Sequence, residues 1–191
     1  MIDQDHKEFD FDELRKHIEV GRHLIDSISF EWQKEKMTNT MGWYPDLVEK
    51  MEISYRAYLS AVYAIRKVDS EFSLVPNRLI DEFWHMHILD TEKYFIDCKA
   101  IFGDYMHHYP YFGIQGEGDA ATWKIQSARS DDIWMRLFGA HLHTPILDGE
   151  ETDAYGLDKH LYAEMSKHFL EDGGISTMGT RCRTCRAAKC P

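Results

Sequence analysis

The fold of this chain is decided by residues 81–110, DEFWHMHILDTEKYFIDCKAIFGDYMHHYP. This stretch holds four histidines, four aspartates and one cysteine among many aromatic residues. No other segment concentrates as many groups able to do chemistry. We therefore expect it to form both the centre of the core and the functional site.

The first part of this stretch predicts one continuous helix over about residues 77–102, with Asn77 as its N-cap and Gly103 at its end. Its surface is apolar almost all round, which is typical of a helix in the middle of a domain. The apolar residues are Leu79, Ile80, Phe83, Trp84, Met86, Ile88, Leu89, Phe95, Ile96 and Ile101. The polar side chains on such a helix need partners, because an unpaired buried polar group costs about 1–3 kcal/mol.

Helical spacing decides which of these polar side chains can act together. His85 and His87 point about 160° apart on a regular helix, so they cannot both bind one ion. The pairs that share a face are Asp81 with His85, and His87 with Asp90. For the second pair we favour a structural role, a buried imidazole held by a carboxylate, and we expect Cys98 to be a small core residue.

After Gly103 the chain should return through a turn that contains His107 and His108 and is closed by Pro110. This return could bring one of the two histidines against Asp81 and His85. A set of Asp81, His85, His107 and His108 has the carboxylate and imidazole composition that iron, manganese or zinc prefers. The equally weighted alternative is a hydrogen-bonded pair, Asp81 with His85, that only holds the helices together.

The same residues carry a resemblance to a known family. The pattern D-x-x-W-H-x-H-I-L-D-T-x-x-Y-x-x-D-C, continued by F-G-x-x-x-H-H-x-P-Y-F-G, is similar to the bacterial proteins called glycine-rich domain-containing protein-like. It covers about residues 75–118, and the resemblance implies no settled activity. The matching positions are Asp81, Trp84, His85, Tyr94, Cys98, Gly103, His107, His108 and Pro110. Relatives can carry an aromatic residue at the position of His87, so the resemblance does not make His87 an obligatory ligand.

Helical patterns also dominate the rest of the chain. The expected elements are a core helix of about twenty residues from Leu14 to Trp32 capped by Asp10 or Asp12, a polar turn at 34–42, a helix from Pro45 to Lys67, a helix from Asp119 to Gly139 with an interruption near Ser130, and a short helix over 157–170. No sustained alternation of apolar and polar residues indicates a strand. The sequence therefore predicts an all-α single domain over residues 1–172, a bundle of about four long helices plus short ones.

The charge of the chain is unevenly distributed. The net charge is −11, but residues 173–191 contain four basic and no acidic side chains, so residues 1–172 carry −15. Such an acidic domain should repel nucleic acid and anionic membranes. The N-terminus has no apolar run of the kind found in secretory signals or membrane spans, and we expect a cytoplasmic protein.

Residues 173–191, GGISTMGTRCRTCRAAKCP, form a basic tail that we expect to be flexible. Its Cys182, Cys185 and Cys190 suit thiolate metal binding or redox exchange. They could instead be sites of chemical modification, or have no special role. Three cysteines do not complete a four-thiolate site, and a basic tail could also dock on a peptide or protein partner.

Two hypotheses of function follow. In the first, the protein is a small helical metalloprotein that binds Fe(II) or Zn(II), with Tyr94 or His87 available for proton transfer if it is an enzyme acting on a peptide or small molecule. In the second, it is a metal-free scaffold or leader-like carrier whose cysteine-rich tail is the working part. The motifs of serine hydrolases, P-loop enzymes, dinucleotide-binding enzymes and zincin proteases are all missing from the sequence.

Overall fold

The computed structural model describes residues 8–143, and no strand occurs within that range. The elements are α1 (Phe11–Asp26), α2 (Glu31–Glu35), a π-helical turn η1 (Lys36–Thr40), α3 (Pro45–Val68), α4 (Arg78–Leu89), α5 (Thr91–Phe102) and α6 (Glu117–Phe138). The predicted all-α fold is confirmed. The short helix predicted over 157–170 and the predicted tail lie outside the described residues.

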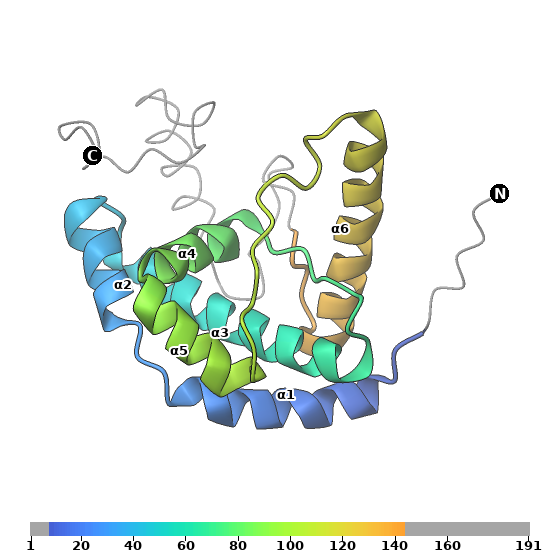
Figure 1. The fold of residues 1–191 in the computed structure, drawn as a ribbon, viewed down its shortest axis with the longest axis horizontal. Helices are drawn as coiled ribbons and strands as arrows, with labels where there is room; N and C mark the ends of the chain where they lie inside the picture. Colours follow the sequence, from blue (N-terminus) through green and yellow to red (C-terminus); the bar gives the residue numbers. More distant parts are fainter. Residues whose placement is uncertain (1–7, 144–191) are drawn as a thin grey trace.

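Helices α1 and α3 form the base of the molecule and run antiparallel to each other (Figure 1). Asp10 caps α1 through hydrogen bonds from the backbone N–H groups of Asp12 and Glu13, and Pro45 begins α3 in its first turn, as the sequence predicts. Gly21 lets the two helices approach closely, because a Cβ atom at this position would lie 3.0 Å from the ring of Tyr63. The outcome is a two-helix platform on which the other helices pack.

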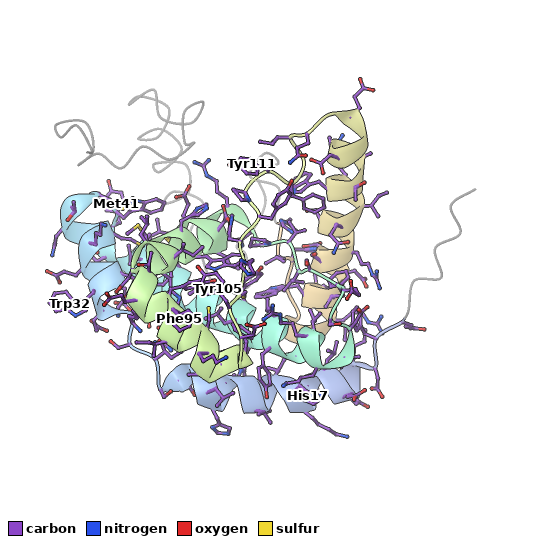
Figure 2. All side chains as sticks on the ribbon, viewed as in Figure 1. His17, Trp32, Met41, Phe95, Tyr105 and Tyr111 are labelled. Atoms are coloured by element: carbon purple, nitrogen blue, oxygen red, sulfur yellow. The ribbon has the colours of Figure 1, made fainter. Side chains whose placement is uncertain are left out.

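The chain between α1 and α3 differs from the prediction. The first helix ends at Asp26 rather than near Trp32. Trp32 lies in the first turn of α2, where it is 77% exposed (Figure 2). Arg56 of α3 explains the early end, since its guanidinium donates hydrogen bonds to the carbonyl oxygens of Ile25 and Ile28. The predicted polar turn over 34–42 is mostly helical, formed by the end of α2 and by η1.

The predicted helix over 77–102 is in fact two helices. Asn77 caps it and Gly103 ends it as expected, but Asp90, with φ −89° and ψ 73°, separates α4 from α5. A chain that turns here cannot keep every apolar side chain of the pattern inside. Three of the residues expected in the core, Leu89, Phe95 and Ile96, are consequently exposed.

Residues 103–116 cross from α5 to α6 without regular structure, and we call them the return segment. α6 stands at a steep angle to the other helices (Figure 1). It is continuous through Ser130, where the sequence suggested an interruption, and ends at Gly139 in the left-handed conformation. Asp119 does not cap α6, and instead its carboxylate accepts hydrogen bonds from the N–H groups of Gly113 and Gln115.

Ser130 joins α6 to the segment before α4. Its hydroxyl donates to the carbonyl oxygen of Gln126 and accepts from the N–H of Val75. None of the described helices is both long and apolar enough to cross a membrane.

Candidate metal centre

Asp81, His85 and His108 come together at the start of α4, and we call them the Asp81 cluster. One potential ligand atom from each lies within 4.8 Å of the others. His108 Nε2 lies 2.8 Å from Asp81 Oδ1, and His85 Nδ1 lies 3.6 Å from Asp81 Oδ2. The rings of His85 and His108 are 4.6 Å apart. A single carboxylate thus faces two imidazoles, and the prediction that the return segment brings a histidine to Asp81 and His85 is confirmed.

The cluster sits at the surface rather than in the core. The side chains of Asp81, His85 and His108 are 33%, 44% and 14% exposed. Solvent and small ligands can therefore reach it from the side of His85.

A relay of hydrogen bonds holds His108 in place. Trp84 Nε1 donates to the hydroxyl oxygen of Tyr94 at 2.8 Å, and this hydroxyl donates to the carbonyl oxygen of Met106 at 2.6 Å. The indole of Trp84 also packs edge-on against His108, with ring centroids 4.5 Å apart. Helices α4 and α5 thereby fix the return segment two residues before His108.

His107 points elsewhere. Its side chain is exposed and packs against the ring of Tyr105, with ring centroids 4.9 Å apart. Two adjacent residues in an extended segment face opposite sides, so only one of the two histidines can join Asp81. In the structure His108 lies in the cluster, and His107 does not.

Tyr94, predicted as a proton-transfer residue, is buried and already uses its hydroxyl hydrogen in the bond to Met106. Burial raises the pKa of Tyr94 far above its usual value. A tyrosine in this state holds its proton, so the contacts favour a positioning role. A part in proton transfer stays a prediction.

His87 is fully enclosed and has a different partner from the one predicted. Its Nε2 lies 2.9 Å from Asp97 Oδ2 of α5, and its Nδ1 lies 3.0 Å from the hydroxyl of Tyr55 on α3. Asp90 instead accepts a hydrogen bond from Gln33. The prediction of a buried imidazole held by a carboxylate is right, but the pair with Asp90 is wrong, because the break at Asp90 turns Asp97 toward His87.

The ionisation of this group is consistent with neutral His87. Burial lowers the pKa of His87, and this effect outweighs the opposite influence of Asp97. Burial also acts to raise the pKa of Asp97, but the hydrogen bonds from His87 and Lys93 outweigh it and leave the pKa lowered. Burial raises the pKa of Tyr55. Neutral His87 therefore donates from Nε2 to ionised Asp97 and accepts at Nδ1 from Tyr55.

Burial and charge also act on the residues of the Asp81 cluster and their neighbours. Burial lowers the pKa of His85, and His108 lowers it further, while Asp81 acts in the opposite direction. Burial raises the pKa of Glu82, assisted by the charge of Asp81 and opposed by Arg78. A neutral imidazole is the form that binds metal ions.

The donor set of the Asp81 cluster fits a divalent transition metal ion. Ligand atoms that bind a tetrahedral ion at about 2.0–2.2 Å lie about 3.5 Å from one another. The contact of 3.6 Å is close to this spacing, whereas the contact of 2.8 Å between His108 and Asp81 is a hydrogen-bond distance that would have to lengthen for an ion to bind. The spread of at most 4.8 Å requires a small closure of the side chains. Two imidazoles and one carboxylate are a common ligand set for Zn(II) and for non-haem Fe(II).

A second polar group, which the sequence did not reveal as a unit, lies after α6. Asp131 accepts hydrogen bonds from His141 Nδ1 at 2.6 Å and from the backbone N–H of His143 at 2.9 Å. These contacts fold residues 140–143 back along α6. Asp131 was missed because nothing in its spacing distinguishes it from an ordinary surface carboxylate.

The cysteines divide into two groups. Cys98 is buried in the core, as expected, and burial raises its pKa. The predicted second site of Cys182, Cys185 and Cys190 lies outside the described residues.

The fold and the Asp81 cluster together define the class, an all-α protein with a candidate two-histidine, one-carboxylate metal centre. The chain belongs to the UCP032817-like family, whose family model matches residues 22–128, more than half of the sequence. This range contains all three residues of the cluster, and the family name specifies no reaction, ligand or partner. The chain matches none of the curated proteins and none of the solved structures significantly.

Proposed function

We propose that this protein binds one divalent transition metal ion through Asp81, His85 and His108. The observation that carries the proposal is a carboxylate with an imidazole against each of its two oxygens. Asp81 and His85 are one helical turn apart on α4, so their spacing is set by the helix itself. The position of His108 is fixed by the hydrogen bonds from Trp84 to Tyr94 and from Tyr94 to the carbonyl oxygen of Met106.

The ligand chemistry favours Fe(II) or Zn(II). Three protein ligands from one side leave one or more positions of the ion open, as in catalytic rather than closed structural sites. A bound ion of this kind acts as a Lewis acid and can activate water, or oxygen if the ion is iron. The exposed side of His85 gives a small molecule or a peptide access to these open positions.

The experiment is elemental analysis of the full chain, purified without a histidine tag and reconstituted with Fe(II) under anaerobic conditions or with Zn(II). We expect close to one equivalent of metal in the unaltered protein, and less than a tenth of that in His85→Ala and His108→Ala. The matched control is His107→Ala, which removes a neighbouring histidine outside the cluster and should keep the metal. Stoichiometric metal in His85→Ala, or its loss in His107→Ala, would refute the assignment.

A second function is favoured by one contact. The distance of 2.8 Å between His108 Nε2 and Asp81 Oδ1 is that of a good hydrogen bond, so the pair can also lock the return segment to α4 without an ion. In that case Asp81→Ala lowers the free energy of unfolding by about 1–3 kcal/mol, and neither metal gives a stoichiometric complex. The Asp81 cluster would then only stabilise the fold of a scaffold protein, and the tail of residues 173–191 would carry the function.

A further inference from the structure

We propose that the return segment binds an extended, basic peptide along one edge of its backbone and presents a side chain of that peptide to the Asp81 cluster. The inference rests on the proposed metal function and names the substrate class of that site. Binding uses backbone hydrogen bonds and contacts with aromatic rings, and no covalent bond forms or breaks in this step.

The backbone of the return segment around His108 has few hydrogen bonds. Within residues 8–143, the N–H groups of four successive residues, 106–109, donate to no backbone or side-chain acceptor. Backbone groups without a partner in the protein bond to water or to a ligand. A row of such groups in an extended chain is a template for pairing with another chain.

The two edges of this segment are not equivalent. The segment runs as an extended line past α5 and α4 (Figure 1), and in an extended chain successive residues turn their N–H and C=O groups to opposite edges. The carbonyl oxygen of Met106 accepts a hydrogen bond from Tyr94, so its edge faces α5. The backbone groups of His107 and Tyr109 form the opposite edge, which we call the free edge. A peptide that pairs there adds a strand, a common mode of peptide recognition.

Aromatic rings line one face of the same segment. Tyr105, His107 and Tyr109 occupy alternate positions, so their side chains share one face of an extended chain. His108 points to the other face, toward the Asp81 cluster. The rings of Tyr105 and His107 lie 4.9 Å apart, and those of Tyr109 and Tyr111 lie 5.8 Å apart. Tyr109 and Tyr111 are 59% and 55% exposed, and Figure 2 labels Tyr105 and Tyr111 along this row.

Charge favours a basic peptide. The return segment contains no lysine or arginine, and residues 1–172 carry −15. Exposed tyrosine rings attract the cationic side chains of arginine and lysine. An acidic peptide would be repelled by the domain. A proline-rich peptide lacks the N–H groups that pairing with the free edge requires.

Pairing on the free edge also determines which group of the peptide meets the ion. Side chains directly opposite each other on paired strands share a face, with their Cβ atoms about 4.5–5.5 Å apart. The peptide residue opposite His108 therefore points its side chain toward the ligands of the ion. The residues on either side of it face the tyrosine rings. A metal ion at the Asp81 cluster would accordingly act on a side chain of the peptide and not on its backbone.

The first test uses the unaltered full chain and a fluorescent octapeptide of alternating arginine and valine with blocked ends. Fluorescence anisotropy measures its binding without metal. We expect saturable binding that is at least tenfold weaker when the four central backbone nitrogens are methylated, because the methylated peptide keeps its charge but cannot donate. Glutamate in place of arginine should also weaken binding at least tenfold. Equal affinity of the methylated peptide, or no binding of the original one, would overturn the inference.

Two variants at one position test whether the peptide binds on the return segment. His107→Pro removes an N–H group of the free edge and should weaken binding at least tenfold. His107→Ala keeps that N–H group and loses only the ring, so the expected loss is clearly smaller. Circular dichroism checks that both variants retain their helices. Unchanged affinity in a folded His107→Pro would overturn the inference, and if this variant does not fold, the methylated peptide decides.

Cobalt tests whether the peptide reaches the Asp81 cluster. Cysteine replaces one central valine or one central arginine of the octapeptide, and each peptide is added anaerobically to the chain loaded with one equivalent of Co(II). A thiol that loses its proton to water and binds cobalt gives a charge-transfer band in the near ultraviolet. We expect the band only with cysteine at the valine position, which faces His108. The band with both peptides or with neither would overturn the inference. Intact peptide binding in a chain that binds no Co(II) would refute the metal function instead.

Discussion

The imidazole of His87 has a hydrogen bond at each ring nitrogen and almost no contact with solvent. A complete buried hydrogen-bond group of this kind contributes little to the net free energy of unfolding. Removing one partner lowers that free energy much more, because the remaining polar atom stays buried without a hydrogen bond. Lys93 shares Asp97, so the same carboxylate also neutralises a partly buried ammonium group. Asp97 is therefore the residue on which this part of the core depends.

Replacing Asp97 by alanine should lower the free energy of unfolding by about 1–3 kcal/mol, since His87 Nε2 and Lys93 both lose their acceptor. Urea denaturation followed by circular dichroism measures the loss. The matched control is Asp90→Ala, which removes the carboxylate that spacing alone would select as the partner of His87. Asp90 accepts one partly buried hydrogen bond, from Gln33, whereas Asp97 pairs with both His87 and Lys93, so the expected loss is smaller than in Asp97→Ala. A larger loss in Asp90→Ala than in Asp97→Ala would contradict the structure.

The two carboxylates show what residue spacing can predict. Asp81 and His85 are four residues apart inside one helix, so their proximity follows from helical geometry and could be predicted. His87 and Asp97 are ten residues apart, and they meet only because the chain turns at Asp90. No proline or glycine marks that turn in the sequence, so a local pattern could not predict the pair of His87 and Asp97.

At the scale of elements, the start of α4 is a junction. The side chain of Asn77 accepts the N–H of Ile80 and donates to the carbonyl oxygen of Leu142, so one residue caps the helix and binds the end of the described chain. Next to it, the hydroxyl of Ser130 accepts a hydrogen bond from the N–H of Val75. The cap was predictable from the sequence, but its second bond was not, because it joins residues far apart in the chain.

Asp131 makes this junction sensitive to acid. Burial acts to raise its pKa, but the hydrogen bonds from the N–H of His143 and the ring of His141 outweigh burial and leave the pKa lowered. A carboxyl group with a lowered pKa in the folded state stabilises the protein above the pKa of the unfolded state, about 3.9. This stabilisation is lost as the pH falls below that value and through the lower pKa of the folded state.

Asp131→Asn should therefore reduce the free energy of unfolding by about 1 kcal/mol at pH 7, and the difference from the unaltered protein should shrink as the pH is lowered from about 4 toward 3. Urea denaturation at a series of pH values measures both effects. Asp132→Asn is the control, because the neighbouring Asp132 is exposed, and it should change stability by less than about 0.5 kcal/mol. A loss in Asp131→Asn that persists unchanged at acid pH would exclude the charge of Asp131 as its cause.

At the scale of the whole molecule, the absence of alternating patterns was enough to predict an all-α fold, and the long helix Pro45–Val68 was predicted almost to its ends. The steep placement of α6 could not be predicted in this way. α6 is buried in the core through Ile133 and Trp134, and polar contacts such as Gln126 to the carbonyl oxygen of Ser73 and Arg15 to that of Arg136 also hold it. These contacts join distant parts of the chain and leave no periodic pattern in it.

The Asp81 cluster connects α4 with the return segment, so a metal ion bound there should stabilise the fold and not only the site. An ion that binds the folded state alone adds about 2.7 kcal/mol to the free energy of unfolding at a concentration 100 times its dissociation constant. For a domain of this size such a gain corresponds to a rise in Tm of roughly 5–10 °C. Thermal unfolding of the full chain with and without Zn(II) measures this rise, which a chelator should reverse.

Two variants test whether the rise in Tm comes from an ion bound at the Asp81 cluster. His108→Ala cuts the bond between the return segment and Asp81, and should unfold at the same temperature with and without the ion. His107→Ala lies one residue away, keeps the cluster, and should show the full rise. Equal shifts in both variants would mean that the ion acts elsewhere on an acidic surface. A shift confined to chains with an intact cluster would tie the stability of the described helices to the three residues that meet at the start of α4.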